Sequence, residues 1–224
     1  MKTTLVCFSG IDGSGKTTLC KEVVTELRSH RISSRYVYGR FLPVLVAPLF
    51  KLTSSLMPDS KSPHKSRKTN RESKKHLLRN PIIFKLFVVA VLFDQLLRVL
   101  LKVSLPSLFK REVIICDRYL LDTIVTDVAL TCDFTDTETI QLLRQSLQIF
   151  PKADIVFLVN VPPRIAFQRK SDMHSIESLE RLSRTYLNVA RKFGAIVIDG
   201  TKTPEDLKNI VLIELESIGI QLDK

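Results

Sequence analysis

The segment "FSGIDGSGKTTL", from Phe8 to Leu19, contains three of the chain's seven glycines within six residues. Residues 10–17 fit the pattern G-x-x-x-x-G-K-[ST], and they stand between a strand-like apolar run and a helix-like run. In such a loop, glycines let backbone N–H groups approach phosphate oxygens, and the following helix contributes the positive end of its dipole. We therefore interpret residues 10–17, called the phosphate loop below, as a cradle for the triphosphate of a nucleotide.

The side chains of the phosphate loop have separate expected roles. We expect Lys16 to reach the β- and γ-phosphates and the hydroxyl of Thr17 to occupy a Mg²⁺ position. The residues expected to contact the nucleotide are Gly10, Asp12, Gly13, Ser14, Gly15, Lys16, Thr17 and Thr18. The chain has no Asn-Lys-x-Asp guanine signature, which disfavours a switch GTPase.

Strand-like and helix-like segments alternate along the 224 residues. Apolar runs predict five strands, at residues 3–10, 33–39, 112–119, 153–161 and 194–200. Thr135 with Glu138, and Thr203 with Pro204, are typical of helix starts. We predict an α/β fold of one domain, in which a five-stranded parallel sheet has helices on both faces.

Charged residues also stand at the ends of two predicted strands. Asp117 and Arg118 end the third strand, and Arg40 ends the second. The carboxyl ends of parallel strands border the ligand crevice, where a carboxylate can hold Mg²⁺ and an arginine can clamp phosphate. Two arginines opposite a triphosphate cradle imply a donor and an acceptor phosphate, which is the geometry of a phosphoryl transferase.

Two further segments are rich in basic residues. Residues 164–180 include Arg164, Arg169 and Lys170, and we predict a lid that neutralises transition-state charge and excludes water. Residues 61–79 carry eight Lys or Arg residues within a predicted insertion at about 58–80. We favour a solvated loop for that insertion. The alternatives are a flap over an anionic substrate and an arm that binds nucleic acid, the latter consistent with the net charge of +11.

The apolar stretch from Ile82 to Val103 is not expected to span a membrane, because Lys85, Asp94 and other polar residues interrupt it. Gln95, Arg98 and Lys102 would share one face of a helix, so we predict a long, mostly buried helix with one polar face. The amino-terminal segment does not resemble a signal peptide, and four cysteines make no disulfide framework. We expect a cytoplasmic protein.

Taken together, these motifs resemble the thymidylate kinase family of nucleoside monophosphate kinases, and its archaeal branch in particular. The resemblance covers most of the chain. It rests on "FSGIDGSGKTT", on "CDRY" at residues 116–119, on "ADIVFLVNVPPRIAFQR", and on "RTYLNVARKFGAIVIDG". The phosphate loop alone is shared by many proteins, whereas the ordered set is more specific. The resemblance implies the P-loop kinase fold.

The family resemblance also implies roles for individual residues. Asp12, Lys16, Arg118 and Arg169 would be catalytic, with Asp12 near the acceptor phosphate or the metal and Arg169 as the lid arginine. Thr17 and Asp117 would hold Mg²⁺. The acceptor nucleotide would contact Arg40, Phe93, Arg98, Asp117, Arg118 and Tyr119. In the family, thymine is read by a Phe-x-x-Asp-Arg stretch; here "LFDQLLR" has its arginine one helical turn later, at Arg98.

We predict an enzyme that transfers the γ-phosphoryl group of ATP, with Mg²⁺, to a nucleoside monophosphate, and we favour dTMP as the acceptor. One alternative is a kinase for another nucleotide or a nucleoside. Another is a non-catalytic protein that binds nucleotides or nucleic acid, which we do not favour. The apolar segments 41–57 and 82–109 exceed what one small domain needs to bury, and the family commonly forms pairs, so we also predict a homodimer.

Overall fold

The computed structural model describes residues 3–40, 78, 80–170 and 175–222. The predicted basic insertion and the apolar segment 41–57 fall outside this part of the chain, apart from Leu78 and Asn80, and so does the middle of the predicted lid. The described residues form an α/β fold whose five strands are all parallel, in the order β2-β3-β1-β4-β5. The five predicted strands are confirmed as β1 (Thr4–Ser9), β2 (Ser34–Tyr38), β3 (Val113–Asp117), β4 (Ile155–Asn160) and β5 (Ile196–Asp199).

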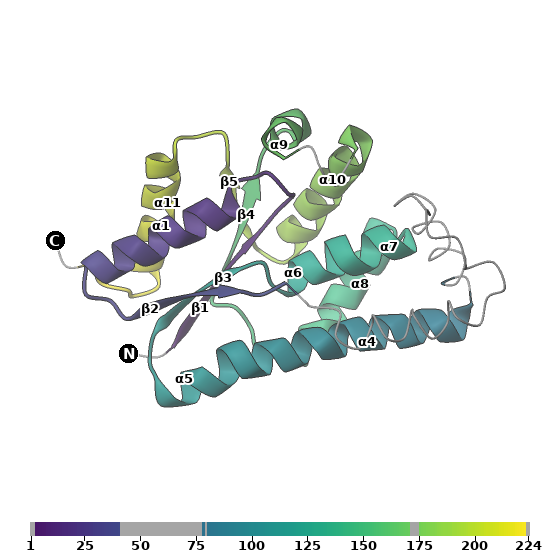
Figure 1. Ribbon diagram of the computed structural model, residues 1–224, viewed down its shortest axis with the longest axis horizontal. Helices are drawn as coiled ribbons and strands as arrows, with labels where there is room; N and C mark the ends of the chain where they lie inside the picture. Colours follow the sequence, from purple (N-terminus) through teal and green to yellow (C-terminus); the bar gives the residue numbers. More distant parts are fainter. Residues whose placement is uncertain (1–2, 41–77, 79, 171–174, 223–224) are drawn as a thin grey trace, which may run out of the picture.

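Helices connect the strands (Figure 1). Before β3 they are α1 (Lys16–Ser29), α4 (Pro81–Val99), the π-helical η1 (Leu100–Ser104) and α5 (Leu105–Phe109). Between β3 and β4 lie α6 (Leu120–Asp122), the π-helical η2 (Thr123–Ala129), α7 (Leu130–Cys132) and α8 (Asp136–Ser146). The remaining helices are α9 (Pro163–Arg169), α10 (Ile176–Lys192) and α11 (Pro204–Ser217).

The sheet is buried on both faces, as expected for parallel strands. Alternate residues of β1 point to opposite sides, so Val6 and Phe8 join one core and Leu5 and Cys7 join the other. The first core contains apolar residues of α1 and α11. The second contains residues of α4, η1, η2, α8 and α10, and Figure 1 shows α1 and α11 together, on the side of the sheet away from α4.

Local sequence signals account for the ends of two helices. The Thr135 hydroxyl accepts a hydrogen bond from the N–H of Glu138, and the Glu138 carboxylate accepts one from the N–H of Thr135. At α11, the Thr203 hydroxyl accepts from the N–H of Asp206, and Pro204 takes the first helical position. Both predicted starts are therefore confirmed, because each cap satisfies N–H groups that have no partner within the helix.

The prediction for the helix from Ile82 to Val103 is only partly correct. α4, η1 and α5 continue into one another along one side of the molecule (Figure 1), but the helix is not mostly buried. Its polar residues Asp94 and Gln95 face inward, and its outer face is apolar and exposed. We call this outer face the α4–α5 stripe; it comprises Ile82, Leu86, Val89, Phe93, Leu97, Leu100, Leu101, Leu105, Leu108 and Phe109.

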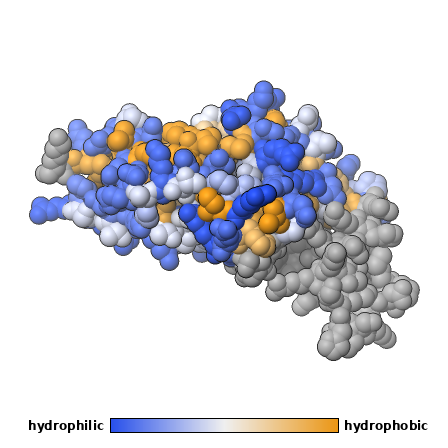
Figure 2. All heavy atoms as spheres, turned by 90° about the horizontal axis from the view of Figure 1, so that it is seen from above, coloured by the Kyte–Doolittle hydropathy of each residue, from blue (hydrophilic) through white to orange (hydrophobic). Residues whose placement is uncertain are grey.

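The α4–α5 stripe lies on one side of the molecule, and the opposite side has a different character. Figure 2 views the protein from the side opposite α4 and α5, and hydrophilic residues there surround smaller apolar groups. Within the described residues, no helix is both long enough and apolar enough to cross a membrane.

The strand register aligns the carboxyl ends of the three strands that carry the predicted site. Phe8 of β1 and Tyr38 of β2 both pair with Asp117 of β3. Directly after β2, Gly39 packs against the turn that follows β3. A Cβ atom at Gly39 would lie 2.2 Å from the Arg118 carbonyl oxygen and 2.5 Å from the Cys116 sulfur. Only glycine lets the two strand ends approach this closely.

This contact predicts a specific loss of stability. We expect Gly39→Ala to lower the free energy of unfolding by about 3 kcal/mol, the upper end of the usual cost of overpacking, because the added methyl group would overlap rigid backbone atoms. Gly219→Ala is the control, since a Cβ atom there meets nothing within 4 Å. Because Gly219 has a positive φ, we expect Gly219→Ala to lower the free energy of unfolding by about 1 kcal/mol. Urea denaturation of both variants measures the difference, and equal stability of the two would contradict the packing described here.

Candidate functional site

The phosphate loop joins β1 to α1, and its glycines allow two close backbone contacts. A Cβ atom on Gly10 would lie 2.5 Å from the Val159 carbonyl oxygen, and one on Gly13 would lie 2.3 Å from the Ala166 carbonyl oxygen. Both residues also have positive φ angles. Neighbouring strand β4 and helix α9 therefore fix the path of the loop, and they leave room for no side chain at either glycine.

Lys16 is only 3% exposed and lies inside the curve of the loop. Its Nζ donates hydrogen bonds to the Ile11 carbonyl oxygen at 2.6 Å and to the Ser14 hydroxyl at 3.0 Å. Burial, helped by the positive charge of Arg118, lowers the pKa of Lys16 to about 8. The ammonium group is thus weakly solvated and held by neutral oxygens, which favours an incoming anion. Thr18 lies exposed in the first turn of α1.

Asp117 ends β3 and meets the first turn of α1. Its Oδ2 accepts hydrogen bonds from the hydroxyls of Thr17 at 2.6 Å and Tyr36 at 2.9 Å. Its Oδ1 is buried and has no hydrogen-bond partner in the part of the chain that the structure describes. Burial, followed by the negative charge of Asp117, raises the pKa of Tyr36, so the phenol stays protonated and able to donate. The predicted meeting of Thr17 and Asp117 occurs in the structure.

These oxygens fit the predicted magnesium site. Mg²⁺ prefers hard oxygen ligands, usually one or two carboxylates with water and substrate phosphates. Thr17 and Asp117 supply a hydroxyl and a carboxylate, and the unpartnered Oδ1 of Asp117 has a free position for a ligand. No group of three or more His, Cys, Asp or Glu residues in the described ranges could hold a metal ion by itself. A magnesium ion here would therefore depend on nucleotide phosphates for further ligands.

Arg118 follows Asp117 and is buried among carboxylates. It has a left-handed backbone conformation, with φ of 68°, and its N–H donates to the Phe8 carbonyl oxygen at 2.9 Å. One terminal nitrogen of the guanidinium pairs with Asp12 of the phosphate loop. The other donates to Asp122 of α6 at 3.2 Å. The structure thus brings the predicted acceptor arginine directly against the phosphate loop.

Arg40 joins the same edge of the sheet from β2. Its guanidinium forms an ion pair of 2.8 Å with Asp127 of η2. Burial raises the pKa of Asp127, opposed by the charge of Arg40, and the second oxygen of Asp127 is buried without a hydrogen-bond partner. The charges of Arg118 and Asp12 also act on Arg40. The two predicted arginines therefore converge.

Arg169 lies on the outer side of the phosphate loop. It ends α9, is exposed, and its guanidinium donates to the Gly200 carbonyl oxygen at 3.4 Å. Gly200 itself approaches the backbone of Ser14. The structure therefore places Arg169 beside the loop but not in contact with Arg118 or Lys16, and residues 171–174 of the predicted lid lie outside the described part of the chain.

Three predicted acceptor residues are not gathered with the rest. Phe93 is 53% exposed in the α4–α5 stripe, on the face of the helix opposite Gln95. The Tyr119 hydroxyl donates to the Pro151 carbonyl oxygen at 2.9 Å, so it points toward the loop before β4. Arg98 is half-buried, and its Nε has no hydrogen-bond partner. It stands between Gln95, which contacts Gly39, and Lys102, which contacts Arg35, and so lies below the crevice edge.

Gln95 was missed as a site residue. It is fully buried, and its side-chain N–H donates to the Gly39 carbonyl oxygen at 2.8 Å. A carbonyl can only accept, so the amide nitrogen must face Gly39 and the amide oxygen must face away. That oxygen is buried and has no hydrogen-bond partner among the described residues. A glutamine within an apolar helix indicates a residue with a specific polar partner, but the sequence does not show which group Gln95 faces.

Four further residues contribute to the site and were also missed. Tyr36 holds Asp117, and Asp127 holds Arg40. Asp122 pairs with Arg118, and Tyr186 donates a hydrogen bond to Asp122. Only Asp122 had a usable signal, an acidic residue four positions after Arg118 and hence one helical turn away. Tyr36, Asp127 and Tyr186 form their hydrogen bonds with residues that are 60 to 87 positions away in the sequence, so no local pattern indicates them.

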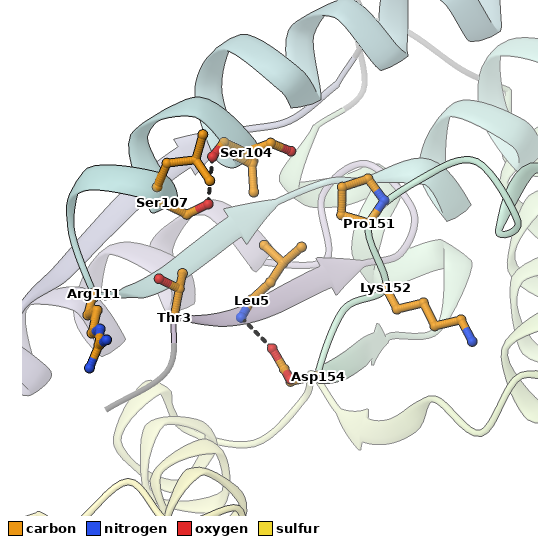
Figure 3. Close-up of a pocket in the computed structure, with 10 residues that line it drawn as sticks. Thr3, Leu5, Ser104, Ser107, Arg111, Pro151, Lys152 and Asp154 are labelled. Carbon is orange, nitrogen blue, oxygen red and sulfur yellow. Dashed lines mark hydrogen bonds between the residues drawn. The ribbon is translucent and has the colours of Figure 1, made fainter.

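A hollow elsewhere on the molecule does not match this chemistry. A groove of about 670 Å³ is lined by Thr3, Leu5, Ser104, Arg111 and Asp154, among others (Figure 3). It lies at the amino ends of the strands, where Asp154 accepts a hydrogen bond from the N–H of Leu5. Ligands of open α/β sheets bind beyond the carboxyl ends, so the charged crevice around Lys16 and Arg118 is the candidate site.

The fold and the site together define a class of protein. A parallel sheet, a phosphate loop opening into a helix, and buried arginines at the neighbouring strand ends are the parts of a phosphate-loop nucleotide kinase. No protein-family model matches the chain. Individual proteins of known name do match the chain, and their names indicate which nucleotide kinases it resembles.

The similar proteins are thymidylate kinases by name. A probable thymidylate kinase of Sulfurisphaera tokodaii is 28% identical, with 90% of this chain and 90% of that protein covered. The thymidylate kinase of Leptospira borgpetersenii serovar Hardjo-bovis is 29% identical, with 92% and 90% covered. The thymidylate kinase of Plasmodium falciparum is 22% identical, with 98% and 93% covered. These similarities, of 22–29% identity over most of the chain, support an assignment to the thymidylate kinase family.

The burial of Lys16 generates a prediction about pH. Its pKa of about 8 lies below the value of about 10.4 in an unfolded chain, so between these values the unfolded state binds more protons. The free energy of unfolding then rises with pH. We expect the unliganded protein to gain about 2 kcal/mol relative to Lys16→Met between pH 7 and pH 10.

Urea denaturation of both proteins across this pH range measures the effect. Taking the difference between wild type and Lys16→Met cancels the titration of the remaining groups, including the buried cysteines. A difference in unfolding free energy that stays constant from pH 7 to pH 10 would show that Lys16 is not held in the environment described.

Proposed function

We propose that this protein transfers the γ-phosphoryl group of ATP to the 5′-phosphate of dTMP, producing ADP and dTDP. The names of its relatives support the reaction, and the phosphate loop supports the donor. The observation that carries the proposal is Arg118, a buried cation at the end of β3 that directly contacts Asp12 of the phosphate loop. A hydrolase that uses water as acceptor would need no such second cation.

The chemistry proposed for these residues is positioning and neutralisation of charge, since phosphoryl transfer needs little covalent help from a protein. Lys16 would exchange its bonds to Ile11 and Ser14 for phosphate oxygens. Thr17 and Asp117 would hold Mg²⁺, which would supply positive charge to neutralise the phosphates. Arg118 and Arg40 would hold the phosphate of the acceptor in line with the donor. Arg169, close to the outer side of the loop, would reach the transferring group from the lid.

The acceptor base is proposed from Gln95. Its amide nitrogen is engaged by Gly39, so its buried oxygen offers an acceptor to a ligand. A base with a ring N–H, such as the N3–H of thymine, would satisfy that oxygen, whereas cytosine has no proton at N3. A buried polar atom left unpaired is costly, so this contact would favour dTMP over dCMP. The setting proposed for this activity is the cytoplasm, consistent with four cysteines that are all free thiols.

An ADP-release assay across a panel of nucleoside monophosphates tests the proposed function. We expect ADP formation to require an acceptor and to be fastest with dTMP. Arg118→Ala should raise the KM for dTMP about tenfold or more and the KM for ATP much less, because of the two nucleotides only the acceptor is proposed to contact Arg118. ADP formed equally well without any acceptor would disprove the proposal.

We also propose that the protein acts as a homodimer joined through the α4–α5 stripe. This face exposes ten large apolar side chains within one continuous helical segment, and their exposed fractions range from 42% at Leu100 to 86% at Phe109. Contiguous apolar surface of this kind marks an interface. A second copy of the chain would cover it with an equivalent apolar face, as in isologous dimers.

Light scattering at micromolar concentration tests the dimer. The wild type should have twice the mass of one chain, and Leu97→Glu should reduce that mass by placing a charge in the interface. Ile213→Glu is the matched control, because Ile213 is 62% exposed on α11, against the other face of the sheet. A monomeric wild type, or loss of the dimer in the Ile213 variant instead, would contradict this interface.

A further inference from the structure

Arg118 has an unusual environment, even for a catalytic arginine. Its side chain is almost fully buried, and its two terminal nitrogens are each engaged by a different carboxylate, Asp12 and Asp122. These contacts use two of the five N–H donors of the guanidinium. Asp12 belongs to the phosphate loop and Asp122 to α6. The guanidinium is therefore held between two separate elements, with donors left for a ligand.

Asp122 is held in place by several hydrogen bonds next to Arg118. It is completely buried, and its Oδ1 accepts both from Arg118 at 3.2 Å and from the Tyr186 hydroxyl at 2.9 Å. Its Oδ2 faces the N–H of Tyr119 at 3.4 Å. A carboxylate removed from water is costly unless it is paired and hydrogen-bonded. Two of these three contacts are with Arg118 and with the backbone directly after it, and the third is with the Tyr186 hydroxyl.

Tyr186 supports this carboxylate from a distant helix. Its ring is buried in the core, and its hydroxyl reaches Asp122 from α10. Because its single proton goes to Asp122, the Thr126 hydroxyl must donate to Tyr186, across 2.8 Å. Burial, together with the charge of Asp122, raises the pKa of Tyr186 well above its ordinary value, so the hydroxyl remains a donor. The chain of contacts thus runs from α10 through Asp122 to Arg118.

We propose that Asp122 and Tyr186 are positioning residues that fix the guanidinium of Arg118 for the acceptor phosphate. Without Asp122, Asp12 would be the one carboxylate of the described residues that pairs with the guanidinium, which could then rotate toward the phosphate loop. Without the Tyr186 hydroxyl, Asp122 would lose the bond that orients it from α10. This inference rests on the proposed function in taking Arg118 as the acceptor residue, but it adds two residues that need not touch any substrate.

Titration calorimetry on Tyr186→Phe and Asp122→Asn tests the inference, with dTMP and a non-hydrolysable ATP analogue as separate probes. Both substitutions keep the shape of the side chain. We expect the Kd for dTMP to rise about tenfold in Tyr186→Phe and further in Asp122→Asn, because each weakens a charge-assisted contact. The Kd for the ATP analogue should stay within about twofold, a change far smaller than one lost hydrogen bond produces.

Ser34→Ala is the matched control. The buried Ser34 hydroxyl donates a hydrogen bond of 3.2 Å to the Val24 carbonyl oxygen, and the substitution removes this bond. Ser34 lies at the amino end of β2, at the opposite end of the strand from the crevice. The substitution should leave both Kd values unchanged. In an Arg118→Ala background, Tyr186→Phe should have no further effect on dTMP binding, since the group that it positions is gone.

The outcomes separate this inference from the proposed function. If the wild type binds dTMP and forms dTDP, but Tyr186→Phe leaves the Kd for dTMP unchanged or weakens both ligands equally, the positioning role is wrong and the function stands. If Tyr186→Phe weakens dTMP equally in the Arg118→Ala background, its effect does not pass through Arg118, and the inference fails. A wild type that does not bind dTMP overturns both the inference and the proposed function.

Discussion

The register of β3 against its two neighbours is the constraint on which the site depends. Phe8 and Tyr38 both pair with Asp117, so the loop after β1, the turn after β3 and the end of β2 meet at one level. Arg118 then reaches the phosphate loop directly, and Gly39 allows the strand ends to touch. Slipping a parallel strand by one residue would turn its side chains to the opposite face and separate these groups.

Charge balance explains how so many ionic groups can be buried at this edge of the sheet. Arg118 lies between Asp12 and Asp122, Arg40 pairs with Asp127, and Lys16 is held by neutral oxygens. Each pairing offsets the desolvation that burial imposes. Lys16 has no carboxylate as a hydrogen-bond partner among the described residues, so burial lowers its pKa. Bound phosphate oxygens would supply the negative charge that its present partners do not.

Local patterns predicted most of the fold. Apolar runs located all five strands, and the Thr135 and Thr203 caps located two helix starts. The phosphate loop and the Asp117–Arg118 pair could also be found, because each is contiguous in sequence. Tyr186 and Asp127 could not, since their roles come from partners on other elements. Phe93 and Gln95 show a related difficulty: helix periodicity separates their faces, but it does not say which face the rest of the chain covers.

The hydrophobicity of α4 was misleading for a physical reason. An apolar helix with a few polar residues normally buries its apolar side, but here Asp94 and Gln95 are buried beside Phe87, Val91 and Val99, and the α4–α5 stripe is exposed. Gln95 faces inward because the Gly39 carbonyl oxygen needs a donor at the crevice edge. The apolar residues can face outward only if something else covers them, which composition alone does not reveal.

The most direct test of the central claim is to follow the phosphoryl group itself. The protein would be incubated with dTMP and with ATP that is radiolabelled in its γ-phosphate, and the products would be separated by chromatography. Transfer between two nucleotides held in one crevice predicts that the label appears in dTDP in proportion to the ADP formed. Label that appears only in inorganic phosphate, with no labelled nucleotide besides ATP, would contradict the account.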